Sequence, residues 1–184
     1  MVICLTGMMG CGKSSTGREL AGRLSLPFFD LDEVIEARSG RKIPDIFAAE
    51  GEAVFRTMER EALADLLDAV GEGVLALGGG TVMTPACADL VRSRTRCIYL
   101  KTSADTLCRR LTGVGQTEVR PLLCRAEHRP DGSQPPADSF RHRIETLLAG
   151  REPVYASVAR FTVDTDGLSP SEVAEAIRKH LGAL

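Results

Sequence analysis

Short apolar runs alternate along the chain with segments in which apolar residues recur at spacings of three and four. The runs cover residues 2–6, 27–29, 73–77, 95–100 and 160–163. Runs of this length are typical of parallel strands that are buried on both faces. The spacing of Leu63, Leu66 and Leu67 indicates a helix between two of them. The pattern therefore predicts an α/β domain in which helices cover a parallel sheet.

The start of the last helix is marked by its own residues. Ser169 precedes Pro170, and Glu172 follows Ser169 by three positions. A serine hydroxyl can cap the first helical turn while the glutamate returns to the backbone of the serine, and proline fits the first helical position. We expect a helix that begins at Pro170.

Residues 112–138 interrupt the alternation. This segment is rich in glycine, proline and charged residues, among them Arg120, and has almost no apolar periodicity. A loop of this length inside a domain is usually a functional lid or a disordered insertion. Its basic residues favour a mobile lid over about 112–138. The chain shows no internal repeat and no linker, so we expect one domain over residues 1–184.

Composition excludes several functions. The 184 residues carry 23 basic and 25 acidic side chains, a net charge of −2, which gives no reason to expect nucleic acid or an anionic membrane as a partner. No apolar stretch reaches the ~20 residues that span a bilayer, and no secretory signal is evident, so we expect a cytoplasmic protein. The six cysteines form no metal-binding pattern and are expected to be reduced and structural.

Residues 7–14, with the sequence GMMGCGKS, form a phosphate-binding motif between a predicted strand and a predicted helix. The glycines let backbone N–H groups surround an anion, and the helix N-terminus adds its positive dipole end. Lys13 would reach the β- and γ-phosphates, and the Ser14 hydroxyl would ligate Mg²⁺. An ordinary glycine turn is the alternative. The motif predicts binding of a nucleoside triphosphate but does not identify the phosphoryl acceptor.

Asp30 and Asp32 follow the second predicted strand, at the sheet edge where ligands bind. Because they are two residues apart, one carboxylate can approach the Mg²⁺ water shell while the other reaches an acceptor hydroxyl and takes its proton. Alternatively, Asp32 caps the helix that follows.

Two further patterns have structural and functional interpretations. Arg56 and Glu59 lie three apart on a helix predicted over residues 52–70, and a solvated ion pair is the usual explanation of that spacing. Residues 78–80 are three glycines at the end of a strand, where the backbone could approach a ligand closely. A tight turn is the alternative there.

Taken in order, these motifs resemble the shikimate kinase family. That pattern comprises the phosphate loop, a DxD after the second strand, an FRxxE helix, three glycines, an RPLL segment and an RxxxY. In this chain they lie at residues 7–14, 30–32, 55–59, 78–80, 120–123 and 151–155. The resemblance spans nearly the whole chain. It implies a P-loop kinase fold with a five-stranded parallel sheet of order 2-3-1-4-5 flanked by helices.

The resemblance also implies a reaction and a role for individual residues. The reaction is transfer of the γ-phosphoryl group of ATP to the 3-hydroxyl of shikimate, on the path to chorismate and aromatic amino acids. Lys13, Asp32 and Arg120 would be catalytic, and Mg²⁺ would lie by Ser14 and Asp30. ATP would contact Gly10, Cys11, Gly12, Lys13, Ser14, Ser15, Arg110 and Arg120. Shikimate would contact Asp32, Arg56, Gly78, Gly79, Gly80 and Arg151, and residues of about 31–60 would form the shikimate-binding segment.

Two features depart from the family pattern. The stretch between Arg120 and Arg151 is longer than expected, and Leu168 stands where a basic or polar residue is expected near the adenine. Another small-metabolite kinase, such as gluconate kinase, is the alternative enzyme, and a non-catalytic nucleotide-binding module is the alternative class. Arg56, the three glycines and Arg151 argue against the first. The joint presence of Lys13, Ser14, Asp32 and Arg120 argues against the second. We expect a monomer.

Overall fold

The computed structural model describes residues 1–112 and 137–182. The elements are β1 (Val2–Thr6), α1 (Lys13–Leu24), β2 (Phe28–Asp30), α2 (Leu31–Ser39), α3 (Ile43–Ala69), β3 (Gly73–Ala76), the 3₁₀ helix η1 (Thr81–Met83), α4 (Pro85–Arg94), β4 (Thr95–Lys101), α5 (Ala104–Thr112), α7 (Ala137–Val158), β5 (Phe161–Asp164) and α8 (Pro170–Gly182). Strands and helices alternate as the hydrophobic pattern predicts.

The five strands form one parallel sheet in the order β2-β3-β1-β4-β5, which confirms the predicted fold. The central strand β1 lies between β3 and β4, and every residue of β1 and β3 is buried. The chain crosses to one side of β1 for β2 and β3 and to the other side for β4 and β5. In such sheets, ligands bind beyond the carboxyl end of the strand at which this reversal occurs.

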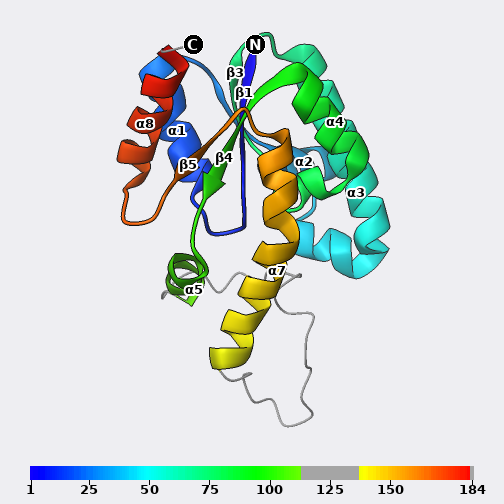
Figure 1. Ribbon diagram of the computed structural model, residues 1–184. Coiled ribbons are helices and arrows are strands. Elements are labelled where there is room, and N and C mark those ends of the chain that lie inside the picture. The colour runs from blue at the N-terminus through cyan, green and yellow to red at the C-terminus, as the bar shows by residue number, and fades with distance from the viewer. Residues whose placement is uncertain (113–136, 183–184) are drawn as a thin grey trace.

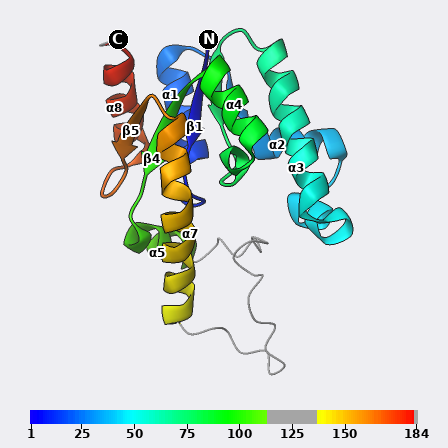
Figure 2. The same ribbon diagram turned by 45° about the vertical axis from the view of Figure 1, so that its right-hand side comes forward.

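Helices cover both faces of the sheet. On one face α1 packs against α8, and on the other lie α3, α4 and α7 (Figures 1 and 2). The helix α5 packs against α7 beyond the carboxyl end of β4. The apolar side chains of strands and helices form a core that includes the buried Leu5, Leu75 and Ile98. The loop after β1 therefore follows directly from a strand that is packed into this core.

The helix predicted over residues 52–70 is longer in the structure and is interrupted. The helix α3 spans Ile43–Ala69, but Gly51 has φ 80° and ψ 177°, which are not helical. Glycine adopts this conformation without the penalty of a side chain, so the chain changes direction between two helical segments. The first segment begins at Ile43 and has Pro44 in its first turn, and the side chain of Ile46 is fully buried.

The last helix begins where predicted. The helix α8 starts at Pro170, and the Ser169 Oγ and backbone N–H both donate to the Glu172 carboxylate, at 2.7 and 2.8 Å. The backbone N–H of Glu172 in turn donates to the Ser169 Oγ at 3.3 Å. This reciprocal arrangement is a capping box, which satisfies donors that the first helical turn would otherwise leave unpaired.

The cysteines are mostly core residues. Cys4, Cys11, Cys87 and Cys97 are buried and Cys108 is half-buried, as expected of small hydrophobic side chains. Burial raises the pKa of the Cys4 thiol to about 12, against a smaller opposing effect of a hydrogen bond with Thr95. Within residues 1–112 and 137–182, no helix combines the length and apolar character needed to cross a membrane.

Candidate active site

The phosphate loop joins β1 to α1. Gly12 has φ 98° and ψ 23° and is the N-cap of α1, and no side chain caps this helix. A left-handed conformation at this point is accessible to glycine at little cost. The amides of the first turn of α1 therefore remain available to an anion, and the helix dipole adds to their positive potential.

Lys13 lies inside the loop. Its ammonium donates hydrogen bonds to the carbonyl oxygens of Gly7, at 2.9 Å, and Met8, at 3.2 Å. The two carbonyl oxygens thus hold the amino group over the loop backbone. A charged phosphate oxygen is a stronger acceptor than a carbonyl oxygen and could replace them. The contact of Lys13 with the β- and γ-phosphates stays a prediction.

Ser14 and Asp30 meet where α1 and β2 adjoin. The Ser14 Oγ donates to the Asp30 Oδ2 at 2.5 Å, and the Asp30 Oδ1 accepts from the backbone N–H of Asp32 at 3.1 Å. Asp30 is thus the N-cap of α2, so the interpretation of Asp32 as the cap is wrong. The strand ends one residue later than the run 27–29 suggested, and Asp30 is the last residue that remains extended. The hydroxyl and carboxylate oxygens form a hard donor pair of the kind that suits Mg²⁺.

Arg56 and Glu59 form the ion pair that their spacing suggested, but it is not a solvated one. The Arg56 Nη1 donates to the Glu59 Oε2 at 2.7 Å, and the Glu59 side chain is 1% exposed. Glu52 contacts the Nη2 of Arg56 at 3.3 Å. Burial by itself would lower the pKa of Arg56, yet the charges of Glu59 and Glu52 and their hydrogen bonds raise it above its ordinary value. The guanidinium is therefore held firmly in its charged form.

The three glycines let these groups come together. A Cβ atom at Gly78 would lie 2.9 Å from the Asp32 Oδ1 and 3.0 Å from the Glu59 Oε1, and one at Gly80 would lie 2.6 Å from the Arg56 Nη2. Any larger residue at either position would collide with a charged side chain. The turn after β3 is thus a place where backbone and functional side chains approach closely, beyond the requirements of a tight turn.

Arg151 approaches the same turn from α7. Its Nη1 donates to the carbonyl oxygen of Gly79 at 3.2 Å, and the Tyr155 hydroxyl donates to the same oxygen. Burial raises the pKa of Tyr155 to about 12, and the nearby charge of Arg151 opposes that rise. Tyr155 therefore stays protonated as a donor.

A cavity of about 730 Å³ connects these groups. It runs from Arg110 and Leu168, past the phosphate loop, to Asp32 and Arg56. Its walls include all the predicted contact residues of the described chain except Arg151, which is half-buried and donates to the carbonyl oxygen of the lining residue Gly79. Within the described residues, no group of three or more His, Cys, Asp or Glu side chains could hold a metal ion. A metal here would depend on Ser14, Asp30 and ligand oxygens.

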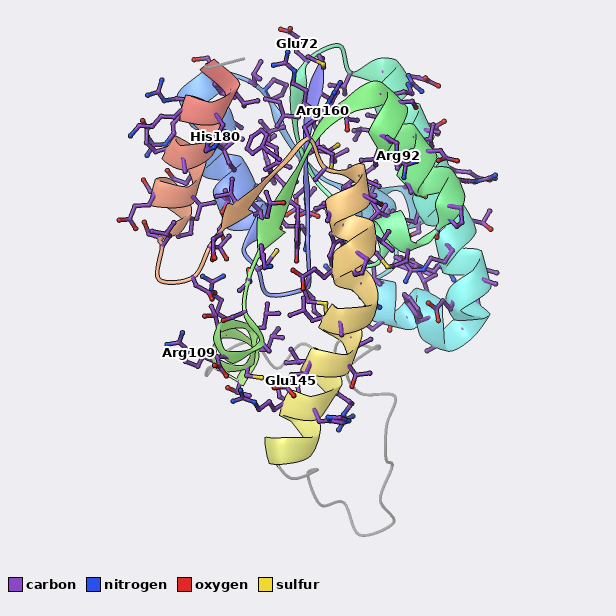
Figure 3. All side chains as sticks on the ribbon, viewed as in Figure 1. Glu72, Arg92, Arg109, Glu145, Arg160 and His180 are labelled. Carbon is purple, nitrogen blue, oxygen red and sulfur yellow. The ribbon has the colours of Figure 1, made fainter. Side chains whose placement is uncertain are left out.

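Arg110 closes one end of the cavity. Its Nη1 donates to the carbonyl oxygen of Cys11 at 3.0 Å, and its Nη2 donates to that of Thr165 at 3.3 Å. The preceding residue, Arg109, extends to the outer side of α5 and bonds to Thr106 of its own helix (Figure 3). Leu168 is 37% exposed and lines the cavity with Pro170, which gives this end an apolar wall.

Sequence reasoning did not single out several residues of the acceptor end. Phe47 lines the cavity and packs against Phe55 at a ring-centroid distance of 4.6 Å, with the two rings tilted by 37°. The break at Gly51 obscures the helical spacing that would relate them. Thr81, which is buried beside Glu59, has no local sequence signal at all. Arg120 and most of the lid predicted over 112–138 lie outside the described residues.

The fold and the site together define a P-loop kinase. A nucleotide-binding loop follows β1, the strand at which the order of the 2-3-1-4-5 sheet reverses, and it lies next to a pocket with its own charged groups.

Comparison with known proteins identifies the family of P-loop kinases to which the chain belongs. The family model of shikimate kinase matches residues 9–182. A shikimate kinase of Thioalkalivibrio sulfidiphilus is 42% identical over 97% of this chain and 85% of its own length. A shikimate kinase of Thermus thermophilus is 42% identical over 97% of this chain and 89% of its own length.

The solved structures agree. The shikimate kinase of Acinetobacter baumannii in complex with shikimate superposes with a TM-score of 0.85 and 31% identity, covering 99% of this chain and 93% of that one. The chain belongs to the shikimate kinase family, whose members are ATP-dependent phosphotransferases. The alternatives of a gluconate kinase and of a non-catalytic module are thereby set aside.

Proposed function

We propose that the cavity transfers the γ-phosphoryl group of Mg-ATP to the 3-hydroxyl of shikimate, with ATP at the phosphate loop and shikimate between Asp32, Arg56 and Gly79. The main support for this proposal is that one cavity contains both the phosphate loop and the pocket around Asp32 and Arg56. Asp32 lies beside Gly78 in that pocket. Hydrogen bonds from Ser14 to Asp30 and from Asp32 to Asp30 connect the phosphate loop with the pocket. The shikimate bound to the Acinetobacter baumannii relative supports this choice of acceptor.

On the donor side, the amides of the loop and of the first turn of α1 would bind the phosphates. Lys13 would exchange its carbonyl partners for β- and γ-phosphate oxygens and balance charge on the transferring group. Ser14 would contribute its hydroxyl oxygen to Mg²⁺, and Asp30 would orient that hydroxyl. Bound Mg²⁺ supplies charge neutralisation of the phosphates. Arg110 would contact the base, beside the apolar wall at Leu168.

On the acceptor side, Arg56 and Arg151 would bind the substrate carboxylate, since a guanidinium matches a carboxylate in charge and shape. Asp32 would accept a hydrogen bond from the 3-hydroxyl and take its proton as the oxygen attacks phosphorus. The new oxygen–phosphorus bond forms while the bond from phosphorus to the β,γ-bridging oxygen breaks, which leaves ADP. Phe47 and Phe55 would exclude water from the acceptor end.

Two variants test this division of roles. Lys13→Ala should lose turnover and also bind ATP more weakly, because it removes a positive charge from the phosphates. Asp32→Asn should lose turnover while it binds ATP almost as wild type does, because the change lies on the acceptor side. Calorimetry measures ATP binding, and ADP release is followed with shikimate, quinate, gluconate and no acceptor. Equal loss of ATP affinity in the two variants, or equal ADP release with every acceptor, would contradict the proposal.

We also propose that residues 1–184 act as one domain, as a monomer and in the cytoplasm. The described elements share one sheet and one core cluster, which supports a single domain. Light scattering of the purified chain tests the monomer, and a dimer mass would contradict it. Fractionation of cells that produce the chain tests its location.

A further inference from the structure

The hydroxyl of Thr81 contacts the carboxylate that holds Arg56. Thr81 opens η1, directly after the three glycines, and is fully buried. Its Oγ1 donates to the Glu59 Oε1 at 2.7 Å, while the Glu59 Oε2 accepts from the Arg56 Nη1 at 2.7 Å. Each oxygen of a nearly inaccessible carboxylate therefore has one strong donor, a hydroxyl on one side and a guanidinium on the other.

We propose that Thr81 is a positioning residue for the acceptor: by fixing Glu59, it fixes the direction in which Arg56 presents its guanidinium to the substrate carboxylate. This inference rests on the proposed role of Arg56. A carboxylate bonded through one oxygen can still rotate about its terminal carbon–carbon bond. A second bond through the other oxygen removes that freedom. In a buried site such hydrogen bonds are stronger than in water, so the restraint is substantial.

The surroundings of Thr81 show why it can transmit position. Its backbone N–H donates to the carbonyl oxygen of Gly78, and its own carbonyl oxygen accepts from the N–H of Thr84, both at 3.3 Å. A Cβ at Gly78 would lie 2.9 Å from the Thr81 Oγ1 and 2.9 Å from the Asp32 Oδ1. The threonine is thus anchored to the same turn that approaches Asp32. Because Thr81 is fully buried and does not line the cavity of the described chain, it acts on the substrate only through Glu59 and Arg56.

Substitution of the hydroxyl tests this role. Thr81→Val keeps the shape and removes the donor, and Thr81→Ala removes the donor with less risk to packing. Both should raise the KM for shikimate on the order of tenfold, because a hydrogen bond to a charged group is lost, while the KM for ATP stays as in the wild type. Thr81→Ser keeps the hydroxyl and should restore the KM for shikimate.

Thr95→Val is the matched control. Thr95 is also buried, and its hydroxyl donates at 2.7 Å to the carbonyl oxygen of Val91, far along the chain from the acceptor groups. It should lower the melting temperature as Thr81→Val does and leave the KM for shikimate unchanged. If both threonine-to-valine variants alter stability alone, Thr81 is only a structural residue and the proposal is wrong.

Combining Thr81→Val with Arg56→Ala distinguishes a failure of the role proposed for Thr81 from a failure of the role proposed for Arg56. If Thr81 acts through Arg56, adding Thr81→Val to Arg56→Ala should weaken shikimate binding no further, as measured by calorimetry. Additive losses would overturn the relay through Arg56. If Arg56→Ala weakens binding and Thr81→Val does not, the role of Thr81 fails alone. If Arg56→Ala leaves binding intact, the proposed site itself fails, and the role of Thr81 with it.

Discussion

Alanine at position 80 should displace Arg56 without unfolding the protein. Gly80 has φ −114° and ψ −4°, a conformation that alanine can also adopt, so the backbone gains little strain. A methyl group there would lie 2.6 Å from the Arg56 Nη2 and 3.0 Å from its Nη1. The colliding atoms form the far end of a flexible side chain. The guanidinium should therefore move, while the turn stays in place.

The size of the shift follows from contact distances. Non-bonded heavy atoms rest about 3.5 Å apart, so the Nη2 of Arg56 must retreat by roughly 1 Å. A movement of that size breaks or distorts the 2.7 Å bond from Arg56 to the Glu59 Oε2. Misplacement of a positioning group by about 1 Å can cost on the order of a hundredfold in rate. We expect kcat/KM for shikimate to fall by between about tenfold and a hundredfold.

Coupled ADP-release kinetics and thermal unfolding measure the outcome for Gly80→Ala. Gly150→Ala is the matched control, because a methyl group at Gly150, within α7, meets nothing within 4 Å. The control should keep its kinetics and gain slightly in stability, since alanine favours a helix more than glycine does. Wild-type kcat/KM in Gly80→Ala would refute the reasoning. A large fall in its melting temperature would do the same, because it would mean that the backbone had moved.

Three further outcomes are expected. Arg151→Ala should raise the KM for shikimate about tenfold or more with little change in melting temperature, whereas Arg109→Ala should leave that KM unchanged. Ser169→Ala should lower the free energy of unfolding by about 1 kcal/mol, measured in urea, with unaltered turnover. Burial would raise the pKa of Glu36, but Lys42 and the backbone N–H of Ile43 lower it below its ordinary 4.5. Its stabilisation should therefore hold at neutral pH and fade as pH falls below 4.5, so Glu36→Gln should converge on wild-type melting temperatures in acid.

The sequence predicted those parts of the fold that depend on residues close to one another along the chain. The strands could be found because each is a short apolar run, and the phosphate loop because its residues lie consecutively between a strand and a helix. The start of α8 at Pro170 followed from Ser169 and Glu172, which contact each other directly. In each case the interacting residues are close in sequence.

What sequence could not predict depends on contacts between distant residues. The spacing of Arg56 and Glu59 is the same for a solvated and for a buried pair, and Glu59 is buried only in the folded protein, where η1 and other elements pack against α3. Thr81 is 22 positions from its partner Glu59. The choice of Asp30 over Asp32 as N-cap depended on where β2 ends, which is decided by its pairing with β3. Strand order came from the family resemblance rather than from the pattern itself.

The close packing around the three glycines also limits the routes by which this site can evolve. A side chain at position 80 collides with Arg56, and one at position 78 collides with Asp32, Thr81 and Glu59. The effect of a mutation at either glycine therefore depends on which residues already occupy those positions, a case of epistasis that follows from geometry. A lineage that lost Arg56 first could afterwards accept a larger residue at position 80. In the opposite order it would pass through an enzyme with a displaced arginine. Both intermediates bind shikimate less well, so selection for shikimate phosphorylation would close both paths and preserve Arg56 and Gly80 together.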